Sequence, residues 1–312
     1  MTNNKATQPQ LFNQQPGNRV KAYLALAAIS FLWGTTWIAS RQAVQDLPPL
    51  QLSAIRQLLA GMVFLVYFLF KRTSWPRGKE WFTITVLSFL NLFLTNGLTT
   101  IGVKYIPAGL ASIIAAIFPL WLVIFGLFRN KIKIPIRAIL GLLLGFTGIC
   151  VIFYEHLKDL LNLDFRFGIL VSLTASLTWA LGTIYTKKEV KSFNPYFSIC
   201  LQMILSGILL LFVATLSGNW IPLSQVPSRP WFDIVYLAIF GSVLTFMAYL
   251  YALQRLPAEQ VSVYAYLNPV VAVILGWVFF QEKFTLFIGL GGLITLYGVF
   301  LVNKSFQIGG RL

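Results

Sequence analysis

The sequence predicts an all-α integral membrane protein whose ten transmembrane helices form two inverted five-helix repeats. Three observations support this prediction: the chain is very apolar, it contains ten apolar runs long enough to cross a bilayer, and its halves share a sequence pattern. The composition is 57% hydrophobic and only 11% charged, whereas soluble domains carry about 25% charged residues. A chain with so few charges cannot cover its surface with polar groups, so lipid must solvate most of it.

Each expected helix is an apolar run of about 20 residues, bounded by polar, basic or Pro- and Gly-rich segments. Arg19 and Lys21 before the first run resemble a signal peptide, but that run continues through Trp33 and Trp37, which favours an uncleaved helix. We expect a disordered polar tail over residues 1–18 and a short tail over 304–312. The expected helices are residues 22–40, 50–70, 81–101, 107–128, 135–154, 167–186, 195–217, 231–253, 257–280 and 285–303.

Two proline-containing runs, Tyr105–Gly126 and Arg255–Gly276, share residues at identical spacing. The matched residues in the first run are Pro107, Ala108, Ser112, Ala115, Pro119, Val123, Ile124 and Gly126, which recur as Pro257, Ala258, Ser262, Ala265, Pro269, Val273, Ile274 and Gly276. Related matches extend over five helices in each half of the sequence, so the two repeats cover residues 19–154 and 167–303. Because five is odd, the second copy must insert upside down, which is the inverted-repeat architecture of many carriers.

The basic residues follow the same inversion. With the N-terminus inside, 17 of the 24 Lys and Arg residues fall in inside segments and six in outside ones. This distribution is the positive-inside pattern, and it predicts that both termini are cytoplasmic in a cell (inner) membrane. The formal net charge of +15 therefore does not indicate nucleic-acid binding, which needs basic residues clustered on a soluble face.

The chain resembles the EamA family of the drug/metabolite transporter superfamily over about residues 20–303. The resemblance rests on the motifs at Phe31–Arg41, Ile55–Gly61 and Gly276–Thr285, together with the two proline helices. It implies five-plus-five helices around a central cavity and movement of small metabolites, such as amino acids. One departure is Gln281, where the family often has glycine.

Polar residues inside predicted spans are candidates for a transport path, because polar groups in lipid are costly and face a partner or water. Asn91 and Thr95 share one helical face, and Asn96 widens it; Thr245 and Tyr249 are related positions in the second repeat. The alternative for Ser and Thr is a bond to their own helix or to a neighbouring one. We favour a cavity for the two asparagines.

Arg56 is the one basic residue well inside a predicted span, and its repeat counterpart is the neutral Gln202. Two roles stay open for Arg56. It can bond helix carbonyls and fix packing, or it can bind a substrate carboxylate or phosphate.

Pro119 and Pro269 lie near the middle of equivalent helices, and Asn268 adds a polar group beside the second. Proline removes a backbone donor and frees a carbonyl one turn earlier, so each site is either a static kink, or a hinge or exposed carbonyl that can bind a ligand. Trp33 and Trp179 occupy matching deep positions, and with Tyr264 they are candidates to line a substrate pocket.

The sequence predicts no cofactor and no metal site. It has one histidine and two cysteines in no ligand cluster, and it has no phosphate-binding loop. No Asp or Glu lies at the centre of a predicted span, so proton coupling, facilitated diffusion and exchange all stay open.

The leading hypothesis is a secondary transporter that moves a small organic metabolite by alternating access, with export as the expected direction. The expected partners are that metabolite and membrane lipid, not nucleic acid; the oligomeric state is left open. A non-transporting membrane scaffold is the main alternative. An intramembrane enzyme would need facing carboxylates, histidines or metal ligands, which the sequence does not supply.

Overall fold

The fold was analysed in a computed structural model that describes residues 16–118, 120–121, 124–125, 135–155, 158–189, 193–256, 261 and 264–309. The described residues form helices and contain no strand, which confirms the predicted fold class. Six of these helices are long and apolar enough to cross a membrane, and three more are shorter apolar helices. The exteriors carry large apolar side chains, among them Leu24, Phe212 and Leu293, as expected of a surface that faces lipid.

The first repeat begins with α1 (Pro16–Ala43), α2 (Pro49–Phe70) and α3 (Lys79–Leu87), and then continues through η1 (Ser88–Leu94) and α4 (Thr95–Tyr105). It ends with α5 (Ala108–Ala115) and α7 (Ile136–Glu155). The predicted disordered tail over residues 1–18 is too long, because α1 already begins at Pro16. Residues 1–15 lie outside the described part.

The short η2 (Asp159–Leu161) leads into the second repeat, which starts with α8 (Leu163–Glu189) and α9 (Pro195–Leu216). After η3 (Leu223–Gln225) follow α10 (Ser228–Ala238), η4 (Ile239–Leu244) and α11 (Thr245–Leu253). The last helices are α13 (Tyr264–Phe280) and α14 (Leu286–Gly309), so the helix takes up most of the expected C-terminal tail.

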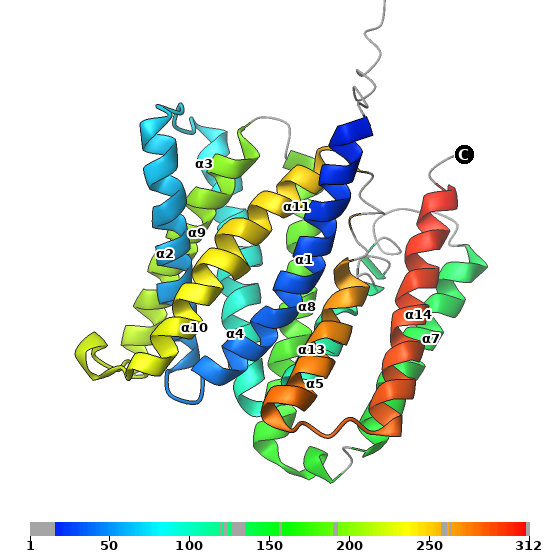
Figure 1. Cartoon of the computed structure of the whole chain (residues 1–312). Coiled ribbons are helices and arrows are strands. Elements are labelled where there is room, and N and C mark those ends of the chain that lie inside the picture. Colours follow the sequence, from blue (N-terminus) through cyan, green and yellow to red (C-terminus); the bar gives the residue numbers. More distant parts are fainter. Residues whose placement is uncertain are drawn as a thin grey trace, which may run out of the picture.

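Helix packing has the approximate two-fold pattern that an inverted repeat requires. The equivalent helices α2 and α9 pack on each other, as do α5 and α13, and α7 and α14. Four further contacts form two matched pairs: α1 packs on α11 as α8 packs on α4, and α1 packs on α13 as α8 packs on α5. The start of α1 and the end of α14 lie on the same side of the bundle (Figure 1).

The pair α7 and α14 is held by backbone-to-backbone contact at glycines. A Cβ added at Gly148 would lie 2.5 Å from the carbonyl oxygen of Gly291, and one added at Gly291 would lie 2.6 Å from that of Gly148. Small residues let helix backbones approach this closely in membranes, so these glycines fix the crossing point of the two helices.

Both repeats contain a π-helix at the same place. The segment η1 joins α3 to α4, and η4 joins α10 to α11. Thr95 and Thr245 follow them directly, and each hydroxyl donates to the carbonyl five residues earlier, that of Leu90 at 2.8 Å and that of Phe240. A π-helix leaves irregular backbone inside a helix and often marks a functional region; nothing in the sequence pattern predicted it.

The two proline helices differ. The first was expected to run unbroken over residues 107–128, but α5 ends at Ala115 and a turn follows at Ala116 and Ile117. In contrast, α13 continues through Pro269. Pro119 lies outside the described residues, so its proposed hinge role stays a prediction.

Candidate functional site

A cavity of about 160 Å³ lies between the two repeats. Its lining comes from α1, α2, α4 and α5 of the first repeat and from α8, α11 and α13 of the second. One water needs about 10–15 Å³ by the same kind of measure, so the space suits a small organic molecule. The residues predicted from sequence that line it are Trp33, Arg56, Thr95, Asn96, Trp179, Tyr264, Asn268 and Pro269.

One wall of the cavity is aromatic. The ring of Trp33 lies 4.9 Å from that of Tyr264, 5.4 Å from Tyr249 and 5.5 Å from Phe246, centroid to centroid. Edge-to-face and tilted pairs at these separations are favourable. Trp33 also donates its indole N–H to the carbonyl of Gly241 in η4 at 3.2 Å. The packing of three rings and this hydrogen bond fix the indole in place.

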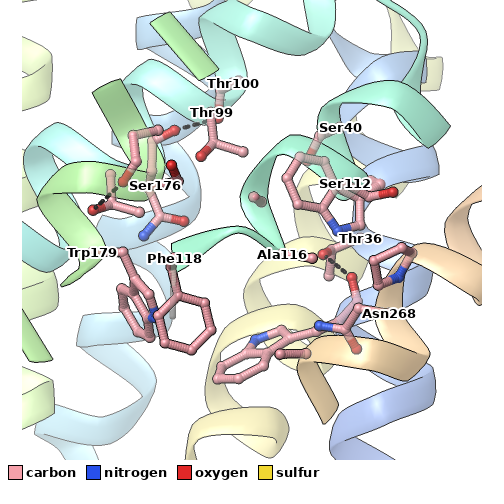
Figure 2. A pocket seen from close by; sticks show the side chains of 18 of the residues that line it. Thr36, Ser40, Thr99, Thr100, Ser112, Ala116, Phe118, Ser176, Trp179 and Asn268 are labelled. Atoms are coloured by element: carbon pink, nitrogen blue, oxygen red, sulfur yellow. Dashed lines mark hydrogen bonds between the residues drawn. The ribbon is translucent and has the colours of Figure 1, made fainter. Parts of the chain in front are cut away.

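The opposite walls carry small hydroxyl groups that the sequence analysis did not select. Figure 2 shows Thr36, Ser40 and Ser112 on one side of the cavity, with Ser176 across from them and Trp179 beside Phe118. A signal for two of them was available, because Thr36 and Ser40 lie three and seven residues after Trp33 and so share its helical face. Several of these hydroxyls donate to their own helices, Thr36 to Trp33 and Ser112 to Gly109, both at 2.6 Å.

Arg56 reaches the cavity from α2 and is only 8% exposed. Its Nε donates to Ser242 Oγ at 3.0 Å, and its Nη2 donates to the Gly241 carbonyl at 3.2 Å. Both partners belong to η4 and are neutral. The π-helix of the second repeat therefore anchors both Arg56 and Trp33 at one carbonyl oxygen.

The polar residues on the first-repeat side are tied together. Asn96 donates from its side chain to the Asn91 carbonyl at 3.3 Å. Thr95 is hydrogen-bonded to Thr178 of α8 at 2.9 Å, and Ser53 of α2 to Thr100 at 2.8 Å. These bonds connect the wall of the cavity to neighbouring helices of both repeats.

Four predicted residues do not line this cavity. Asn91 points at α8, where a Cβ on Gly182 would collide with its side chain. Gln202 donates to Ser198 within α9 at 2.9 Å, and Thr245 is fully buried at the end of η4. Tyr249 contacts Trp33 from behind and so supports the wall rather than forming it.

Asn268 connects α13 to α1 beside Pro269. With its amide nitrogen toward the backbone, it donates to the Ser30 carbonyl at 2.8 Å and to the Tyr264 carbonyl at 3.1 Å. The two helices approach closely here, as shown by a Cβ built on Gly34, which would lie 2.5 Å from the Cβ of Val271. The amide therefore holds α13 against α1 next to the residue that lacks a backbone donor.

A second cavity of about 310 Å³ lies where α5 begins. The carboxylate of Glu282, in the loop between α13 and α14, points at the first N–H groups of α5. Gln281 beside it has a φ of +53°, a conformation that glycine adopts without strain.

A family model described as the EamA-like transporter family matches residues 20–154 and 166–304. The chain belongs to the EamA-like transporter family. The two matches follow the two repeats, and membership makes this EamA-like protein a multi-pass membrane transporter of the drug/metabolite transporter superfamily.

Proteins of similar sequence are named as transporters. The chain is 28% identical to the uncharacterized transporter YvbV of Bacillus subtilis, over 92% of this chain and 93% of that protein. It is 29% identical to the uncharacterized inner membrane transporter YedA of Escherichia coli K12, over 81% and 80%. A crystal structure at 18% sequence identity covers 96% of this chain and 100% of that one with a TM-score of 0.64, so the two chains share a fold.

The cavity of this EamA-like protein has one charged side chain among its described lining residues, that of Arg56. Within the described part of the chain, no group of three or more His, Cys, Asp or Glu side chains could hold a metal ion. Glu259 and the single histidine, His156, lie outside that part.

Proposed function

We propose that this protein is a secondary transporter of the cell (inner) membrane that exports a small organic metabolite, an amino acid or a related compound. Access to the cavity would alternate between the two sides as the inverted repeats rearrange, with both chain termini in the cytoplasm. One observation supports this proposal above the others: the cavity lies between the repeats, and both contribute to its aromatic and polar walls.

The cavity also favours transport over a scaffold. A scaffold has no need of buried hydroxyls, amides and a guanidinium around an interior space, because each polar group removed from water costs free energy unless it is paired. A transported molecule needs such groups for orientation and specificity. Coupling to protons is not part of the proposal, because the described lining holds no carboxylate or histidine.

The test is flux in proteoliposomes loaded with a metabolite mixture, with and without a pH gradient. We expect release of at least one compound by the wild-type protein. Ala116→Phe, which fills the cavity, should abolish it, whereas Leu293→Phe, on a residue that is 66% exposed on the outside, should not.

Absence of flux for every compound, with a folded and inserted protein, would favour the scaffold. Flux that Ala116→Phe leaves unchanged would move the path away from this cavity. Equal flux with and without the gradient is expected; flux that depends on the gradient would show coupling to protons, which the proposal does not include.

A further inference from the structure

The guanidinium of Arg56 is buried and has no counter-ion among the residues that the structure describes. It is 8% exposed, and no carboxylate of the described residues forms an ion pair with it. Removing a cation from water costs several kcal/mol unless an opposite charge and further hydrogen bonds compensate. The hydroxyl of Ser242 and the carbonyl of Gly241 supply two neutral acceptors, which leaves the charge itself uncompensated.

Arg56 also has donors to spare. A guanidinium has five N–H donors, and two of them are used, one on Nε and one on Nη2. The group lines the cavity, so the other donors are available to a bound molecule. Guanidinium groups bind carboxylates through two parallel hydrogen bonds that are about twice as strong as neutral ones.

The rest of the lining is uncharged among the described residues, and much of it is aromatic. Trp33, Trp179 and Tyr264 offer rings, and Phe118 and Phe246 extend the apolar surface. A ligand ammonium would find no carboxylate among these residues.

We propose that Arg56 is the anion-binding residue of the cavity, and that its ligand is a small organic acid with one carboxylate and a flat apolar or aromatic body. This inference rests on the proposed transport function and, among small organic metabolites, moves the expected substrate from amino acids to related organic acids. It favours acids of net negative charge over zwitterionic amino acids, because the lining supplies one positive charge and no negative one.

The test compares four probes that share a phenyl ring and differ in charge: 3-phenylpropionate, 3-phenylpropionamide, L-phenylalanine and 2-phenylethylamine. Binding to the full chain in nanodiscs is measured at low ionic strength, which requires no flux. We expect the acid to bind at least about tenfold more tightly than the amide, as charged hydrogen bonds predict, with phenylalanine between them and the amine weakest.

Variants separate the role of Arg56 from that of positive charge in general. Arg56→Gln should remove the preference for the acid over the amide, and Arg56→Lys should keep part of it. Arg41→Gln is the matched control, because Arg41 also donates to carbonyls, those of Val103 and Lys104, but does not line the cavity. It should leave the preference intact.

Equal binding of acid and amide to the wild-type protein, or failure of all four probes to bind, would overturn the inference. It would also fail if Arg56→Gln kept the preference. If Arg56→Gln does not fold, the wild-type series still decides, because it depends on ligand charge alone. Binding of the acid without any flux would contradict the transport function but support the anion site at Arg56. Flux of cations only would support the transport function but contradict the anion site.

Discussion

Glu282 of the second repeat caps the helix that begins at Ala108 in the first. Its carboxylate accepts from the backbone N–H of Ala108 at 2.8 Å and from that of Gly109 at 3.2 Å. The first N–H groups of a helix have no partner within the helix, and a negative charge there interacts favourably with the helix dipole. At this end of the molecule, a loop of one repeat is thus attached to a helix start of the other.

Replacing Glu282 with alanine should therefore lower the free energy of unfolding by about 0.5–2 kcal/mol, the usual range for loss of a helix cap. Thermal unfolding of the purified protein in detergent measures it. Lys283→Ala is the control, because it changes the neighbouring charge without touching the cap. Equal melting temperatures for wild type and Glu282→Ala would show that the contact contributes nothing.

Gln281→Gly should raise the stability of the protein. The φ of +53° at Gln281 costs a residue with a Cβ about 1–2 kcal/mol, and glycine avoids this strain. Glycine also makes the unfolded chain more flexible, which offsets part of the gain in stability. The expected net gain is about 0.5 kcal/mol. Lys283→Gly, where the described backbone does not have a positive φ, should instead be neutral or destabilising; a gain of the same size there would refute the strain argument.

The crossing of α7 and α14 should tolerate no added methyl group at Gly148. A Cβ there meets the Gly291 carbonyl at 2.5 Å, and overpacking of this kind costs about 1–3 kcal/mol. Gly292→Ala provides the comparison, since its Cβ would have no neighbour closer than 3.7 Å. We expect a clear fall in melting temperature for Gly148→Ala only; similar melting temperatures for both variants would mean that the two helices can separate freely.

Variants of Thr95 and Thr245 should have similar effects on stability but different effects on ligand binding. Changing either to valine removes the hydroxyl bond to a π-helix carbonyl and should cost about 1 kcal/mol, whereas serine should restore most of it. Only Thr95 lines the cavity, so only Thr95→Val should also change the affinity for a transported compound. A matching change of affinity in Thr245→Val would place the binding site elsewhere.

The helix positions and the inversion could be predicted because they depend on properties that a sequence carries directly. Apolar runs of sufficient length must span the bilayer, and an odd number of helices per copy must invert it. The deep placement of Trp33, Trp179 and Arg56 also followed from their positions within the runs. The bilayer fixes these features through the length and polarity of each helix, whatever the packing between helices.

The remaining features depend on helix rotation and backbone detail. Asn91 and Thr95 lie four residues apart and were predicted to share one helical face. Asn91, however, lies within the π-helix η1, where the regular α-helical spacing does not hold, and only Thr95 and Asn96 line the cavity. Ser176 has no marked sequence context, and Ser112 recurs in the repeat as Ser262 without any sign of a cavity; the helix packing shows that both line the cavity. The prolines at equivalent positions did not predict that the first helix breaks at Ala116 while α13 stays continuous.

The matching π-helices have a consequence for the history of the chain. An irregular turn at the same register in both copies, closed by a threonine in each, is most simply inherited from one ancestral five-helix unit rather than acquired twice. Two such units inserted in opposite orientations would already have enclosed a cavity between them as a pair of separate chains. Within one chain the two halves are free to differ, and they do so at the equivalent positions Arg56 and Gln202.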